Sequence, residues 1–220
     1  MPLRIAVDGP AGSGKSTISK IIAEKLNLIY IDTGAMYRAC AYLSVKYGLI
    51  GAALVDKLKD CDISFKKDGE RQRVILKINL HELDVTDEIR SAEVTAKVSE
   101  TSKITEVREI LTKKQQEIAS KSDVIMDGRD IGTVVIPDAE YKFYLDANAN
   151  ERAKRRFEEL TAKGIDVNFE EILQSVIKRD FEDMNREVAP LKKADDAILI
   201  DTSSMTIDEV VNKILERVLA

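Results

Sequence analysis

Short apolar runs alternate along this chain with longer stretches in which apolar residues recur every three or four positions. A short apolar run bounded by polar or turn residues is typical of a buried strand, whereas the longer spacing is typical of an amphipathic helix. Strands are predicted at residues 3–7, 28–31, 124–126, 141–145 and 198–200. Helices are predicted from about 15 to 26 and at 35–47, 91–99, 105–120, 150–163 and 169–185. Thr206 and Glu209 have the spacing of a capping box, which predicts a closing helix after them.

The segment from residue 61 to about residue 89 follows a different pattern. Its short stretches alternate polar and apolar positions, as in Val74-Ile75-Leu76-Lys77-Ile78, and a polar turn separates the first two of them. This pattern is typical of an antiparallel sheet. We therefore predict a small β-rich insert at residues 61–90 of a single domain that covers residues 1–220.

The alternation of strands and helices elsewhere predicts an α/β fold of three layers, α/β/α, with a parallel sheet in the middle. Ligands of such sheets bind beyond the carboxyl ends of the strands. Asp8, Asp32 and Asp127 each follow a predicted strand, so all three are expected near that edge.

The sequence between the first strand and the first helix carries the most specific signal. It reads Gly9-Pro10-Ala11-Gly12-Ser13-Gly14-Lys15-Ser16-Thr17 and matches G-x-x-x-x-G-K-[ST] in the context of strand, loop and helix. Such a loop turns successive backbone N–H groups toward a phosphate, and the helix N-terminus adds its positive end. Lys15 is placed to reach the β- and γ-phosphates and the Ser16 hydroxyl to bind Mg²⁺. The motif predicts a nucleoside triphosphate site with Mg²⁺.

Composition and net charge argue against nucleic-acid-binding and membrane proteins. The 220 residues carry a net charge of −5, which argues against broad nucleic-acid binding. Cys40 and Cys61 are far apart and are expected to be buried, reduced thiols, and His81, the single histidine, is expected at the surface. No apolar stretch approaches the ~18 residues that span a bilayer. The first core strand leaves no room for a signal peptide, so we expect a cytoplasmic protein without a membrane partner.

Two strand ends carry candidate metal and phosphate ligands. Asp127 closes a buried strand and is a candidate to hold Mg²⁺ through water, with Asp8 as the competing carboxylate. Arg129 could clamp a phosphate, and Asp130 could accept a hydrogen bond from an exocyclic amine. Structural or solvent-exposed roles remain open for each of these residues on this pattern alone.

Helices carry further candidates. Thr33 is expected to cap the second helix, and Arg38 lies one turn into it. Arg179, Asp183 and Arg186 have the spacing i, i+4, i+7 of one helical face, which on its own is typical of a solvated salt-bridge stripe. The basic cluster Arg152, Arg155 and Arg156 fits either arginines that close over a transferring phosphoryl group or an ordinary charged surface.

Several runs together resemble the bacterial cytidylate (CMP) kinases. They include residues 5–17, Asp32-Thr33-Gly34-Ala35-Met36-Tyr37-Arg38 and Gly128-Arg129-Asp130-Ile131-Gly132-Thr133-Val134-Val135. Shorter matches are Pro137-Asp138-Ala139, Arg179-Asp180 with Asn185-Arg186, and Ala189-Pro190-Leu191, whereas Glu182 and Met184 depart from common family residues. The phosphate loop is shared by many NTPases, whereas the second and third runs are far more specific. The resemblance extends over essentially all of the chain.

The resemblance implies transfer of the γ-phosphoryl group of ATP to CMP or dCMP. It implies that residues 61–90 form the nucleoside monophosphate insert and that residues 152–170 form a mobile lid. It assigns Lys15, Arg129, Arg152 and Arg156 to catalysis. The implied acceptor site consists of Thr33, Tyr37, Arg38, Ser99, Arg108, Arg129, Asp130, Arg179, Asp183 and Arg186, with Ser99, Arg108 and Asp130 at the cytosine.

Other functions share parts of this pattern. A kinase for another small acceptor, such as UMP, AMP or shikimate, would have the same loop and a different acceptor site. A regulatory NTP-binding switch of the GTPase kind would need a guanine-reading N-K-x-D sequence, which this chain lacks. A nucleic-acid-dependent ATPase is disfavoured by the acidic charge. No coiled-coil heptad demands a partner, so a monomer is expected.

Overall fold

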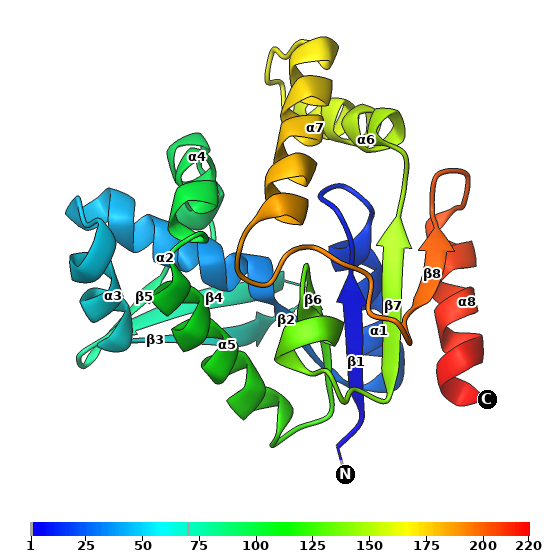
Figure 1. Ribbon diagram of the computed structural model, residues 1–220, viewed down its shortest axis with the longest axis horizontal. Coiled ribbons are helices and arrows are strands. Elements are labelled where there is room, and N and C mark those ends of the chain that lie inside the picture. The colour runs from blue at the N-terminus through cyan, green and yellow to red at the C-terminus, as the bar shows by residue number, and fades with distance from the viewer. Residues whose placement is uncertain (1, 70) are drawn as a thin grey trace. The chain divides into compact units, whose positions relative to one another are not determined.

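The computed structural model describes residues 2–69 and 71–220, and the chain divides into two compact units (Figure 1). Unit 1 consists of Met1–Tyr30 and Ala119–Ala220, and unit 2 consists of Ile31–Ile118. The boundary between them falls inside the second strand. The predicted insert, residues 61–90, lies within unit 2, and its role stays a prediction.

Unit 1 is built on a parallel sheet. The strand order is β2 (Ile29–Asp32), β6 (Val124–Gly128), β1 (Arg4–Asp8), β7 (Tyr141–Asp146) and β8 (Ile198–Asp201). β1 pairs in parallel with β6 and β7, and β7 pairs in parallel with β8. Each strand lies within a residue or two of its predicted position, and the short apolar runs of β1, β6 and β7 are almost wholly buried, as in a parallel sheet covered on both faces. The predicted parallel sheet with flanking helices is confirmed.

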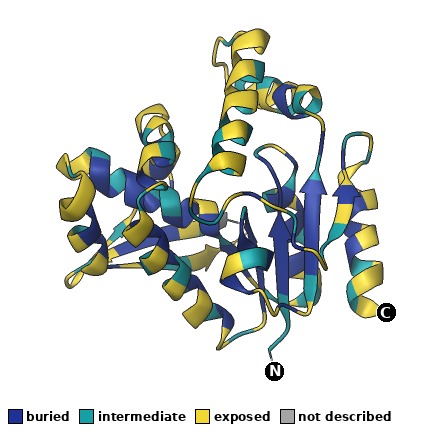
Figure 2. Ribbon diagram, viewed as in Figure 1, coloured by how far each residue is buried: buried dark blue, intermediate teal, exposed yellow. Residues whose placement is uncertain are grey.

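The core of unit 1 lies between this sheet and two helices. Helix α1 (Lys15–Leu26) and helix α8 (Ile207–Leu219) contribute Ile18, Ile22 and Ile214 to one buried cluster with Ile5 and Val7 of β1. Figure 2 shows the central strands as continuously buried. α8 begins with the predicted capping box of Thr206 and Glu209. The sheet therefore holds the loop after β1 on a rigid base.

Three elements complete unit 1. Helix α6 (Ala149–Ala162) packs against helix α7 (Phe169–Asn185), close to the predicted bounds. A single π-helical turn, η2 (Ile131–Val135), follows β6 and was not predicted from the sequence. Such turns occur frequently at functional sites.

Unit 2 contains the predicted antiparallel sheet. Its strands β3 (Cys61–Asp68), β4 (Arg71–Ile78) and β5 (His81–Asp84) pair in that order. Helix α2 (Thr33–Tyr47) packs on helix α4 (Ala92–Thr101), and the 3-10 turn η1 (Glu88–Arg90) precedes α4. Helix α5 (Thr105–Ala119) follows α4. Helix α3 (Gly51–Lys59) was missed, although Leu54 and Leu58 lie one turn apart and are buried.

One local prediction is wrong. Thr33 does not cap α2; it is the first residue of the helix, and the Asp32 carboxylate accepts the hydrogen bond from the Ala35 N–H at 2.9 Å. Asp and Thr are both common at the N-cap, and β2 here runs directly into the helix, so the earlier residue takes the position.

Three other expectations concern single side chains and membranes. Cys40 and Cys61 are buried free thiols, and His81 is exposed, as predicted. Among the described residues no single helix is long and apolar enough to cross a membrane. The bent pair of α2 and α3 passes that test only jointly, by length and composition.

Candidate active site

The loop between β1 and α1 contains three glycines with positive φ. Gly14 stands before the first helical residue with φ 90°, and Gly9 and Gly12 also have positive φ. The predicted order of strand, glycine-rich loop and helix is confirmed. The helix N-terminus leaves its first N–H groups without helical acceptors, which makes this point an anion site.

Three carbonyl groups of the loop, those of Pro10, Ala11 and Ser13, accept hydrogen bonds from side chains of the protein. Ala11 O accepts from Arg152 Nη1 at 3.1 Å, and Ser13 O accepts from the Thr202 hydroxyl at 3.2 Å. Pro10 O accepts from the Ser13 hydroxyl and, at 2.6 Å, from Lys15 Nζ. These hydrogen bonds fix the orientation of the peptide planes, so that the N–H groups of the loop can donate to a phosphate.

Lys15 is held inside this loop. It is 5% exposed, and burial lowers the pKa of its ammonium to about 7. The charge of Arg129 acts in the same direction, and the carboxylates of Asp127 and Asp8 oppose it. A polyphosphate beside the ammonium would reverse this shift, because a nearby opposite charge favours the charged form.

Asp127 lies beside the loop, as predicted. Its carboxylate accepts from the Ser16 hydroxyl at 2.7 Å and from the Tyr30 hydroxyl at 2.8 Å. Sequence reasoning missed Tyr30, and only its place near the end of β2, next to β6, could have indicated it. The pair of a hydroxyl and a carboxylate oxygen offers the hard ligands that Mg²⁺ prefers, so these residues fit that ion.

Asp8, the competing carboxylate, has a different environment. Its two oxygens accept the backbone N–H groups of Ile131 and Gly132 at 2.8 and 2.7 Å. Burial raises the pKa of Asp8 to about 6 although both hydrogen bonds lower it. Asp8 thus anchors the π-helical turn η2, which directly follows Arg129 and Asp130. This supports Asp127 over Asp8 as the metal ligand.

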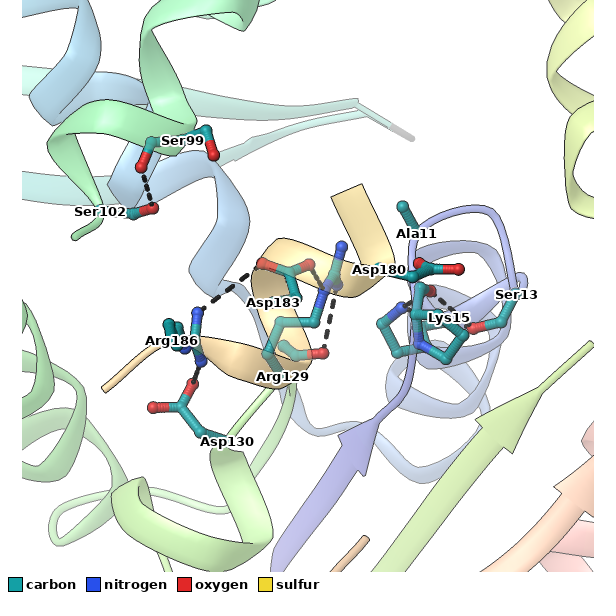
Figure 3. Close-up of polar contacts among 12 residues, drawn as sticks. Ala11, Ser13, Lys15, Ser99, Ser102, Arg129, Asp130, Asp180, Asp183 and Arg186 are labelled. Atoms are coloured by element: carbon teal, nitrogen blue, oxygen red, sulfur yellow. Dashed lines mark hydrogen bonds and ion pairs between the residues drawn. The ribbon is translucent and has the colours of Figure 1, made fainter. Parts of the chain in front are cut away.

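Arg129, Asp130, Asp183 and Arg186 form one charged cluster, the ion cluster, in unit 1 (Figure 3). Asp183 on α7 accepts from Arg129 Nε at 2.8 Å and lies 3.8 Å from Arg186. Arg186 lies 3.4 Å from Asp130. Burial raises the pKa of Asp183, but the charges of Arg129, Arg179 and Arg186 outweigh it and hold that pKa below its usual range. The cluster brings together residues that are far apart in the sequence.

The helical face predicted for Arg179, Asp183 and Arg186 is only partly helical. Arg179 and Asp183 lie on α7, whereas Arg186 is its C-cap, with extended backbone. Its side chain nevertheless returns to Asp183 and Asp130.

Arginines of α6 take three different environments. Arg152 is 5% exposed and forms a bidentate ion pair with Asp180 of α7, with N–O distances of 3.0 and 2.6 Å. Arg155 donates to the Thr202 carbonyl at 2.6 Å. Arg156 is about half exposed and pairs with Glu159. Sequence reasoning missed the role of Asp180, since nothing in the spacing indicates which helix faces Arg152.

The remaining acceptor-site candidates lie in unit 2. Arg38 on α2 donates to the Thr95 hydroxyl of α4 at 2.8 Å. The guanidinium of Arg108 on α5 lies 5.2 Å from the ring centre of Tyr37. Ser99 accepts, through its carbonyl, from the Ser102 hydroxyl (Figure 3). Unit 2 thus places Arg38 next to Tyr37 on one helix and brings Arg108 against that helix.

A phosphate loop set on a parallel sheet and followed by a helix defines a P-loop protein. Residues 5–220 of the chain match the family model described as "Cytidylate kinase". The chain belongs to the cytidylate kinase family.

Curated relatives agree over almost the full length. The cytidylate kinase of Bacillus pumilus is 51% identical over 97% of this chain and 95% of that protein. The cytidylate kinase of Caldicellulosiruptor bescii is 52% identical over 97% of this chain and 94% of that protein. An uncharacterized protein from Eubacterium ventriosum shares the fold, with a TM-score of 0.56 and 13% identity over 100% of this chain and 99% of that one.

Proposed function

We propose that the protein transfers the γ-phosphoryl group of ATP to CMP and dCMP, giving ADP and CDP or dCDP. The observation that carries this proposal is a phosphate loop with its lysine inside, next to a cluster of arginines, in a chain of the cytidylate kinase family. Phosphoryl transfer needs chiefly two aligned nucleotides and positive charge around the moving group. Lys15 and the arginines of this site supply that positive charge.

On the donor side, residues 9–17 bind the ATP phosphates. Their backbone N–H groups and Lys15 contact oxygen atoms whose negative charge grows or shifts during transfer. Arg129, Arg152 and Arg156 add positive charge. Because the attacking atom is a phosphate oxygen that is already ionised, no strong general base is required.

Mg²⁺ fits the oxygen ligands of Ser16 and Asp127, the latter through water. When bound, the ion neutralises charge on the ATP phosphates. Asp127 keeps Ser16 oriented toward it through their hydrogen bond.

On the acceptor side, two arginines are proposed to bind the CMP phosphate, and three residues to read the base. Arg38 and Arg129 have the planar guanidinium that binds a phosphate bidentately. Ser99, Arg108 and Asp130 select cytosine over uracil, since the N4 amine and N3 need an acceptor and a donor. Uracil would mispair with Arg108 and Asp130, which are both buried, and this mismatch disfavours it.

The other acceptor residues are proposed to hold the rest of the nucleotide. Thr33 and Tyr37 lie on α2 beside Arg38, and Arg179, Asp183 and Arg186 are proposed to contact the sugar. The proposal extends to a cytoplasmic monomer that acts on small molecules without nucleic-acid or membrane partners, with the net charge of −5 supporting the part about nucleic acid.

We expect strong ADP release from ATP and Mg²⁺ with CMP and dCMP, and little with UMP, AMP or GMP, in a coupled assay with all five acceptors in parallel. An Asp130→Asn variant should lose preference for CMP over UMP by about tenfold or more, because a hydrogen-bonding site rejects the wrong partner by its unpaired groups. Equal turnover of CMP and UMP by the unmodified protein would keep the kinase and contradict the assignment of the base site. Turnover with no monophosphate would contradict the kinase itself.

Nucleotide binding is expected to take up a proton above pH 7. The ammonium of free Lys15 has a pKa lowered to about 7, so most of the side chain is neutral at pH 8. A bound triphosphate favours the charged form, and binding at pH 8 should therefore take up nearly one proton per ATP. Calorimetry of ATP binding, without acceptor, in buffers of different ionisation enthalpy measures this number. A Lys15→Met variant should show none of this uptake, and equal uptake in both proteins would contradict the assignment.

A further inference from the structure

Asp180 and Asp183 lie one turn apart on helix α7, and each forms an ion pair with an arginine from another element. Asp183 holds Arg129, which follows β6, at 2.8 Å. Asp180 holds Arg152 of α6, with its two oxygens on the two terminal nitrogens. Residues three apart on a helix share a face, so α7 presents both arginines along one side. The first arginine belongs to the proposed acceptor phosphate site, and the second contacts the phosphate loop.

The Arg152 guanidinium is almost fully used by the protein. Nε donates to the Ala147 carbonyl at 2.8 Å, and Nη1 donates to the Ala11 carbonyl as well as to Asp180. Nη2 donates one N–H to Asp180. A guanidinium has five N–H groups. Within the described part of the chain, only the second N–H of Nη2 is left for another acceptor.

Burial distinguishes the Arg152–Asp180 pair from the Arg156–Glu159 pair, which lies within α6. The side chains of Arg152 and Asp180 are 5% and 14% exposed, whereas Arg156 and Glu159 are both 47% exposed. Exposed ion pairs contribute little to stability. A buried bidentate pair holds its two side chains in one geometry, because breaking it leaves a desolvated charge without a partner. Asp180 therefore restricts the Arg152 guanidinium to one orientation.

We propose that Asp180 is a positioning residue for phosphoryl transfer, which orients Arg152 on the phosphate loop in fixed register with Arg129. Asp180 itself contacts no substrate. It keeps Arg152 from rotating toward solvent and keeps the Ala11 peptide in place through Arg152. This role rests on the proposed kinase function, and it makes α7 the element that sets the positions of both arginines.

The first test is an Asp180→Asn variant. We expect its kcat to fall about 10- to 100-fold, as when a preorganised charge is misplaced, while KM for CMP changes less than threefold. Asp180→Glu should recover part of the loss. Glu171→Gln, which removes an exposed carboxylate from the same helix, is the matched control and should keep the original kcat. An unchanged kcat in D180N, or a loss that falls on KM alone, would overturn the proposal.

A double-mutant cycle tests whether Asp180 acts through Arg152. If it does, the double variant D180N/R152M has the kcat of R152M within about twofold, because the orienting group has nothing left to orient. Multiplied losses would assign Asp180 an independent role and overturn the proposal.

A third measurement does not depend on activity. The ¹⁵N–¹H signal of Arg152 Nε, assigned by its absence in R152M, should exchange slowly with water in the unmodified protein and in E171Q. In D180N it should broaden or exchange at least tenfold faster. An unchanged signal would overturn the proposal even if CMP is the substrate. Failure of CMP turnover with the expected change in this signal would overturn the kinase function and leave the ion pair as the holder of Arg152.

Discussion

Alanine in place of Gly9 is expected to destabilise the protein by about 3 kcal/mol or more and to abolish its stabilisation by ATP. Gly9 has φ 145°, a conformation that side chains rarely adopt, and an added Cβ would lie 2.0 Å from the backbone oxygen of Leu145 in β7. Since β7 pairs with β1, relief of this clash must move either a central strand or the phosphate loop. Chemical denaturation with and without ATP measures both effects.

Gly14 provides the matched comparison. Its φ of 90° is also unfavourable for alanine, but no atom lies within 4 Å of the added Cβ. Gly14→Ala should therefore lose only the conformational term, about 1–2 kcal/mol. Equal losses of unfolding free energy in the two variants would contradict the role assigned to the Leu145 carbonyl.

Methionine in place of Lys15 is expected to lower kcat by about 10³-fold without lowering the free energy of unfolding. The activity falls because Lys15 is the cation that residues 9–17 themselves supply to the phosphates. The stability is retained because burial already disfavours that charge, as its lowered pKa shows, and methionine fills a similar volume. Steady-state kinetics and denaturation on the same protein separate the two quantities.

Lys25→Met is the control, because Lys25 lies on the same helix with its side chain exposed. It should leave both kcat and stability unchanged. A K15M protein that unfolds more easily than the original would show that the ammonium stabilises the loop, contrary to the effect of burial.

The sequence predicted most of the fold because local patterns specify most of its elements. β1 and α1 lie close to where periodicity placed them, and α7 spans residues 169–185 as predicted. Helix α3 was missed because it is short, begins at a glycine, Gly51, and has Ile50 at its N-cap in place of a polar residue. The π-helical turn η2 depends on the distant carboxylate of Asp8, which no local pattern contains.

In the site, too, local motifs could be recognised from the sequence, whereas contacts between distant residues could not. Lys15 and Ser16 were recognisable from a motif whose spacing is fixed by the shape of the loop. Other contacts join helices that are separate in the sequence: Asp180 of α7 contacts Arg152 of α6, and Thr95 of α4 contacts Arg38 of α2. Such contacts depend on how each helix is rotated about its axis. Hydrophobic periodicity indicates the buried face of a helix, but it does not indicate which individual side chains meet across two helices.

The most direct test is the fate of the γ-phosphoryl group. With γ-labelled ATP, Mg²⁺ and CMP, we expect label to appear in CDP in the same amount as ADP forms, and K15M to produce neither above background. Formation of ADP with label released as inorganic phosphate would contradict it, because the protein would then be an ATPase or a nucleotide switch rather than a kinase of CMP.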